Sequence, residues 1–84
     1  MIRYTVVWPK AAQDELAELW IAAQDRDAIA SAANSIDAEL SENAPVKGVE
    51  LSEGLRALFA PPVRVLFAVR DEDRVVEVLR VRRL

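Results

Sequence analysis

The hydrophobic pattern changes its period along the chain, and these changes predict the order of secondary-structure elements. Residues 2–8 alternate large apolar residues with more polar ones and are rich in β-branched and aromatic types, which is typical of a strand. Pro9 ends this strand and suits the first turn of a helix, where its missing N–H would have no partner. Apolar residues then recur at helical spacing, at Ala12, Leu16, Leu19, Trp20 and Ala23. The pattern therefore predicts a strand followed by a helix.

A second helical stripe follows a charged break at residues 25–27. Asp25 or Asp27 can supply the N-cap of this second helix, and Ala44-Pro45 ends it. Its apolar stripe comprises Ile29, Ala32, Ala33, Ile36 and Leu40. Two amphipathic helices with such a short connection are expected to lie antiparallel as a hairpin, each burying one face.

From Val49 onward the period is two, which predicts a sheet. Strand-like runs cover Leu55–Ala60, Val63–Arg70 and Arg74–Val81, separated by Pro61-Pro62 and by an acidic turn at residues 71–73. The middle run has one wholly apolar face, which we expect to meet the helices. The predicted order is β-αα-βββ. This is an α+β fold with a helical hairpin packed on one face of a small antiparallel sheet, in a single domain over residues 1–84.

Composition narrows the chemistry that this domain can perform. The chain has 84 residues, no histidine and no cysteine, which excludes zinc fingers, Cys/His or Ser/His nucleophilic sites and iron-sulfur ligation. We expect no metal and no cofactor. The apolar run at the N-terminus is too short for a signal peptide, and no run approaches the roughly 18 apolar residues of a membrane helix. We interpret the chain as a cytoplasmic protein without a membrane partner.

Charge is distributed unevenly, although the whole chain carries only −3. Residues 1–54 hold 4 basic and 10 acidic side chains, whereas residues 55–84 hold 7 basic and 4 acidic ones. The predicted helices are therefore acidic and the predicted sheet is basic. This asymmetry is the first indication of function, because it separates a surface that could contact an anionic partner from one that could not.

Arginines dominate the basic half of the chain. Guanidinium groups stay charged and have a fork geometry that suits phosphate, so they predict a phosphodiester-binding face. Arg64 is the best candidate, because strand alternation places it opposite the core face near the middle of the sheet. The alternative is that the arginines only solvate this face, pair with acids such as Glu77 or protect an edge strand. The group comprises Arg56, Arg64, Arg70, Arg74, Arg80, Arg82 and Arg83.

RNA cleavage would need more than cations. A group must take the 2′-hydroxyl proton and another must protonate the leaving oxygen, and arginine accepts protons poorly. Glu50 is the only acid whose predicted position could face the arginines, with a solvated loop residue as the alternative. We interpret the acids of the helices, Glu15 included, as solvated side chains without chemistry. Trp8 and Trp20, with Tyr4 and Phe67, are expected to fill the core.

The order and spacing of several short motifs resemble the RelE/ParE superfamily of bacterial type II toxins almost end to end. The likeness begins with an opening strand and helix, continues through a second helix that closes at Leu40 and Pro45, and ends in strand motifs. The motifs are Val7-Trp8-Pro9-Lys10-Ala11-Ala12, Asp14-Glu15-Leu16, Leu19-Trp20, Gly54-Leu55-Arg56-Ala57-Leu58, Val63-Arg64-Val65-Leu66-Phe67 and Val76-Glu77-Val78-Leu79-Arg80-Val81.

This resemblance implies the toxin of a toxin-antitoxin module, of the kind linked to plasmid stabilisation. It implies a cognate antitoxin as partner, with a heterotetramer as the expected complex. The activity that we expect from the resemblance is that of the RelE-type members, which are metal-independent endoribonucleases that cleave mRNA on the ribosome and so inhibit translation. The alternatives are a ParE-type inhibitor of DNA gyrase without nuclease activity and a toxin fold that only binds its antitoxin.

Residue by residue, the resemblance matches Arg64 to the arginine that contacts the scissile phosphate in RelE-type toxins. Arg56 matches a basic position on the preceding strand, and Arg82 or Arg83 matches the final basic residue. The predicted catalytic set is Arg56, Arg64, Arg83 and Glu50, and the predicted phosphate or nucleic-acid contacts are Arg64, Arg80 and Arg82.

Overall fold

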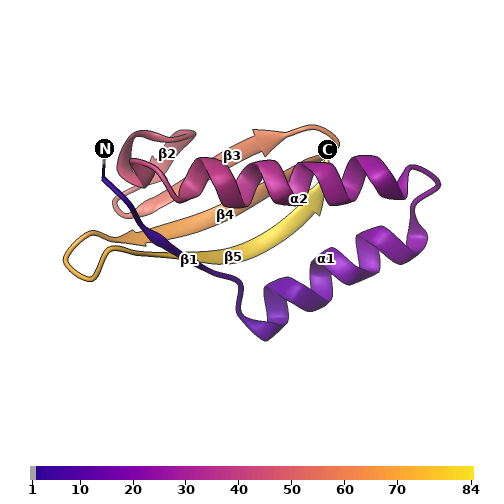
Figure 1. The fold of residues 1–84 in the computed structure, drawn as a ribbon, viewed down its shortest axis with the longest axis horizontal. Coiled ribbons are helices and arrows are strands. Elements are labelled where there is room, and N and C mark those ends of the chain that lie inside the picture. Colours follow the sequence, from indigo (N-terminus) through magenta and orange to yellow (C-terminus); the bar gives the residue numbers. More distant parts are fainter. Residues whose placement is uncertain (1) are drawn as a thin grey trace.

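The computed structural model describes residues 2–84, and its elements follow the predicted α+β order closely (Figure 1). Two predicted strands have the observed bounds, and the last one is displaced toward the C-terminus by one residue at its start and two at its end. The elements are β1 (Thr5–Val7), α1 (Lys10–Ala22), α2 (Arg26–Leu40), the short 3-10 helix η1 (Ala44–Val46), β2 (Val49–Ser52), β3 (Leu55–Ala60), β4 (Val63–Arg70) and β5 (Val75–Arg83).

The strands form one sheet in the order β1-β5-β4-β3-β2. Strands β2, β3, β4 and β5 pair with one another in antiparallel fashion, which confirms the predicted meander. Strand β1 instead pairs with β5 in parallel, so the expectation of a purely antiparallel sheet is wrong at this margin. The reason is the connection, because the chain leaves β1 through two helices and three strands before it returns beside it.

Strand β2 was not predicted, since its residues were interpreted as a connection into the sheet. It pairs with β3 at the sheet margin, and all four of its residues are exposed, so it has no buried face to mark it. Gly48 precedes it with φ +66°, and a Cβ atom there would lie 2.0 Å from the carbonyl oxygen of Ala57. The close approach of β2 to β3 therefore requires glycine at this position.

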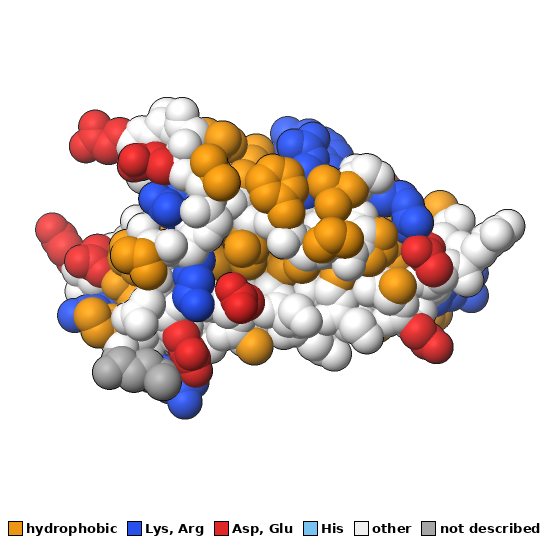
Figure 2. Space-filling view, turned by 90° about the horizontal axis from the view of Figure 1, so that it is seen from above, with side chains coloured by type: hydrophobic (Ala, Val, Ile, Leu, Met, Phe, Trp, Pro, Cys, Tyr) orange, Lys and Arg blue, Asp and Glu red, His pale blue; other side chains and the backbone are white. Residues whose placement is uncertain are grey.

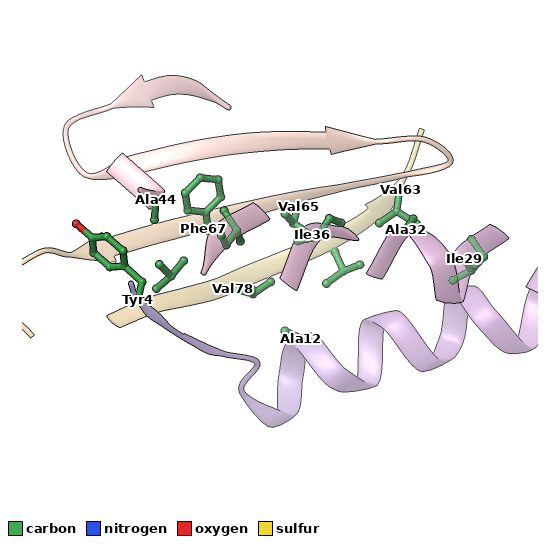
Figure 3. Close-up of a cluster of buried hydrophobic side chains, with 13 residues drawn as sticks. Tyr4, Ala12, Ile29, Ala32, Ile36, Ala44, Val63, Val65, Phe67 and Val78 are labelled. Carbon is green, nitrogen blue, oxygen red and sulfur yellow. The ribbon is translucent and has the colours of Figure 1, made fainter. Parts of the chain in front are cut away.

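The core lies between α2 and the inner face of the sheet (Figure 3). Ile29 and Ile36 of α2 are completely buried, and they face the apolar side of β4 that the sequence predicted. Tyr4 and Phe67 are buried as expected. The sheet contributes Val63, Val65, Phe67, Val76, Val78 and Val81.

Helix α1 lies along β5 at the margin of the sheet rather than over its face (Figure 1). Ala12 is its single buried residue. Trp20 is 44% exposed, so the prediction that it fills the core is wrong. Trp8 does pack partly against the core, and its Nε1 donates to Asp37 at 3.0 Å. A helix at the margin has a smaller apolar surface to cover, which leaves more of its stripe in solvent.

A bulge in β5 decides which of its side chains face the core. Leu66 is paired with Arg80 and the next residue, Phe67, with Val78, which leaves Leu79 without a partner. This extra residue breaks the alternation. Val78 and Val81 are both buried as a result, and Arg80 lies on the outer face of the sheet.

Candidate functional site: an arginine pocket on the outer face of the sheet

Three of the predicted phosphate-contacting arginines meet on the outer face of the sheet. Arg64 lies directly opposite Arg82, and Leu66 lies opposite Arg80, on the paired strands β4 and β5. Together these four residues line a shallow pocket of about 200 Å³, which we call the arginine pocket. Two antiparallel strands thus bring three guanidinium groups to one place, a suitable arrangement for the oxygens of a phosphate group.

Glu15 of α1 is the carboxylate that contacts this pocket. Its Oε2 lies 2.8 Å from Nη1 of Arg82 and 3.3 Å from Nε of Arg80. Its Oε1 accepts a hydrogen bond of 2.8 Å from the backbone N–H of Val81. The prediction that Glu15 is a solvated side chain without a partner is therefore wrong. The cause is the position of α1 beside β5, which directs Glu15 to a stretch of β5 that no strand covers.

The same contacts control the ionisation of Glu15. The hydrogen bond from Arg82 and then the one from Val81 N–H lower the pKa of this carboxyl below its ordinary value, against a smaller opposing effect of burial. Glu15 therefore stays charged at neutral pH and is a weak proton acceptor. It reduces the positive charge of the arginine pocket and offers no general base.

Arg83, a predicted catalytic residue, lies away from the arginine pocket. Its Nη1 and Nη2 contact Oδ1 and Oδ2 of Asp25 at 3.1 and 2.9 Å, a bidentate pair between the end of β5 and the α1–α2 connection. Hydrogen bonding from Arg83 lowers the pKa of Asp25, and the pKa of Arg83 is raised in return. Arg83 thus holds the helical connection against the sheet.

Arg56 and Glu50 lie at a second location, on the β2–β3 pair. They are cross-strand partners and help to line a separate pocket with Gly54. The Nε of Arg56 donates to the carbonyl oxygen of Lys47 at 2.7 Å, and its Nη2 donates to that of Gly48 at 3.2 Å. The predicted catalytic set is therefore divided between the arginine pocket, the Arg56–Glu50 pocket and the Arg83–Asp25 pair.

Sequence reasoning missed Glu15 and Asp25, because each acquires its role from a contact across more than 55 residues. Both residues belong to a polar pattern that any solvated helix surface would show. One signal does exist. Arg80 and Arg82 follow Val76 and Val78 in the alternation, so without a bulge both arginines would have faced the core.

A second surface is apolar. A groove of about 640 Å³ runs between α1 and α2, and its lining includes Trp8, Leu16, Trp20 and Ile29. Figure 2 looks onto the side where β2, β3 and α2 lie uppermost in Figure 1, and it shows hydrophobic side chains gathered across the middle, with basic side chains at the upper margin and at both ends of the view. The exposed apolar residues of the β2–β3 region are Val46, Val49, Leu51 and Phe59.

The described part of the chain, residues 2–84, contains no group of three or more acidic, histidine or cysteine side chains placed to hold a metal ion. None of its helices has the length and apolarity needed to cross a membrane.

Solved structures with a similar fold are toxins or complexes that contain them. The toxin-antitoxin complex RelBE2 from Mycobacterium tuberculosis is matched with 24% identity and a TM-score of 0.81, over 100% of this chain and 94% of the other. The chromosomal ParDE system from P. aeruginosa is matched with 18% identity and a TM-score of 0.69, over 98% of this chain and 97% of the other. A mutant of the E. coli toxin RelE in the free state is matched with 19% identity and a TM-score of 0.68, over 98% of this chain and 84% of the other.

These likenesses define the fold, which is RelE/ParE-like. The sequence model of the ParE toxin of the type II toxin-antitoxin system parDE matches residues 6–83, and the chain therefore belongs to this toxin family. A search of curated proteins gives no match.

Proposed function

We propose that this toxin acts by binding DNA gyrase and inhibiting it, without cleaving RNA. The observation that carries the proposal is the state of the acids near the arginine pocket. Glu15 already accepts from Val81 N–H and Arg82, forms an ion pair with Arg80 and has a lowered pKa, and Glu50 lies at the separate β2–β3 pocket. Without histidine in the chain, the pocket offers cations but neither a proton acceptor nor a proton donor of suitable pKa.

Membership of the ParE toxin family supports the same target, because ParE-type toxins are the gyrase-inhibiting branch of the superfamily. Inhibition by binding needs a surface rather than an acid/base pair. The exposed apolar residues and the outer arginines provide the mixture of anchors and charges that protein interfaces use.

A second candidate function is ribosome-dependent mRNA cleavage, and the arginine pocket favours it. Arg64, Arg80 and Arg82 could stabilise the charge that develops on a phosphorane. In this alternative Arg64 contacts the scissile phosphate. Replacing Arg64 by alanine would then abolish both mRNA cleavage and growth arrest, with the fold unchanged, because the Arg64 side chain is exposed.

A cognate antitoxin is the partner we propose for the apolar surfaces. The groove between α1 and α2 could take an amphipathic helix, and the exposed margin of β2 could take an added strand. The helix would cover Trp20, and the added strand would lie beside the exposed apolar residues of β2. A heterotetramer of two toxins and two antitoxins is the assembly to test by mass measurement of the purified complex.

Two parallel assays of the purified chain test the target. We expect inhibition of supercoiling by purified gyrase, relieved by the antitoxin, and intact mRNA ends in a translating extract. Cut mRNA together with unaffected supercoiling would overturn the proposal in favour of the nuclease. Failure in both assays, with antitoxin binding retained, would assign the chain to a toxin fold that only binds its antitoxin.

A further inference from the structure

Glu15 and the arginine pocket share two of the same side chains. Arg80 and Arg82 line the pocket, and both are also bound to Oε2 of Glu15. The pocket therefore contains three guanidinium groups and has one carboxylate at its side. Among residues 2–84, Arg64 has no carboxylate within ion-pair distance, so it remains available to a ligand.

Glu15 also holds α1 against β5. Its Oε1 accepts from Val81 N–H, on the side of β5 that β1 does not reach, because β1 pairs only with Val75 to Glu77. Ala12 is the one fully buried residue of α1, and Leu16 and Leu19 pack only partly against the core, so this three-point contact adds to a limited apolar attachment to the sheet. The carboxylate thus connects the arginines on the outer face to the helix at the margin.

An oxyanion in the pocket would act against this contact. Its oxygens would take N–H donors from Arg80 and Arg82, and its charge would repel the Glu15 carboxylate a few ångströms away. Glu15 would lose arginine contacts that favour its present position, which weakens its hydrogen bond to Val81. Oxyanion binding in the arginine pocket therefore weakens the attachment of α1 to β5, and by reciprocity the attachment of α1 weakens oxyanion binding.

We propose that Glu15 is a built-in competitor for the arginine pocket, and that a phosphate-class oxyanion bound to Arg64, Arg80 and Arg82 displaces it and loosens α1 from β5. The proposal rests on the same arginine surface as the second candidate function. It requires neither mRNA cleavage nor gyrase inhibition, and it remains testable whichever target the toxin has.

The test uses the full chain and inorganic pyrophosphate at low ionic strength, with affinity measured by calorimetry. Glu15→Gln removes the charge but keeps an oxygen that can accept from Val81. We expect it to bind pyrophosphate about two- to fivefold more tightly than the wild type, the range for a partly exposed ion pair. Glu18→Gln is the matched control, because it makes the same change in charge about one turn further along the same helix, at an exposed residue, and should leave the affinity unchanged.

The Val81 amide gives a readout that needs no variant. In the wild type, its hydrogen exchange should accelerate when the chain is saturated with pyrophosphate, while amides of α2 keep their rates. Arg64→Ala should weaken pyrophosphate binding and leave Val81 protected. Equal or weaker binding by Glu15→Gln relative to Glu18→Gln, an unchanged Val81 rate at saturation, or full affinity in Arg64→Ala would each overturn the proposal.

Discussion

The two helices are attached to the same sheet by different forces. Helix α2 lies across the inner face and buries Ile29, Ala32, Ile36 and Leu40. Helix α1 lies at the margin, where only Ala12 is fully buried and Leu16 and Leu19 pack partly against the core, and it is also attached through the contacts of Glu15 and through Asp25 just beyond its end. One helix is therefore held mainly by its apolar face and the other depends strongly on a few charged groups.

This difference has consequences for how each helix responds to its surroundings. Burial of apolar surface is non-directional and insensitive to salt, so α2 should behave as part of the core. Partly exposed ion pairs are screened by salt and respond to pH. Helix α1 should accordingly be the element whose attachment a ligand or a change in solution can alter, and it also lines the apolar groove.

The largest expected effect is a difference in stability loss between one substitution in α2 and one in α1. Ile36→Ala removes a completely buried side chain of α2 and should lower the free energy of unfolding by about 2 to 5 kcal/mol. Ile21→Ala in α1 removes a side chain that is 65% exposed and should change it by no more than about 0.5 kcal/mol. Urea denaturation measures both, and equal losses would contradict the comparison.

A smaller effect is expected from the polar attachment of α1. Glu15→Ala removes the acceptor of Val81 N–H and the partner of two arginines, and should cost about 1 to 2 kcal/mol at low salt. The cost should shrink in 1 M salt, while that of Ile36→Ala should not. Glu18→Ala, the control on the same helix, should stay within about 0.5 kcal/mol at either salt concentration.

The smallest effect is a dependence on pH, and its sign follows from the lowered pKa of Glu15. The charged carboxylate favours the folded state, so its contribution is complete above the ordinary value of about 4.5 and is lost as the pH falls through the lower folded pKa. The stability difference between wild type and Glu15→Gln should therefore shrink in acid. A difference that grows below pH 4.5 would be inconsistent with this account.

Much of the fold could be predicted from periodicity, because an element with one buried face has apolar residues at regular spacing in the sequence. Helix α2 and strand β4 have such a face, and their positions were predicted closely, as was that of β3, although Ala57 is its one buried residue. Strand β2 was missed since all of its residues are exposed. The parallel pairing of β1 with β5 depends on the path of the whole chain, which no local pattern reports.

The candidate site was predictable in its residue types but not in its arrangement. Arginines on a sheet indicated an anion-binding surface, and Arg64 faces outward as its alternation predicted. The grouping of Arg80 and Arg82 with it depends on the bulge at Leu79, and the role of Glu15 depends on a contact between residues 66 positions apart. The bulge is indicated in the sequence only by arginines at positions that unbroken alternation would bury, and the contact of Glu15 has no local signature.

Native-state hydrogen exchange of the two helices, compared at low and high salt, tests the central claim most directly. It reports the free energy of local opening for each amide. We expect the protection of α1 to fall as salt screens the contacts of Glu15 and Asp25, while the protection of α2 stays constant. Equal salt responses in the two helices, or a larger response in α2, would contradict the claim that charged contacts hold α1 to the sheet.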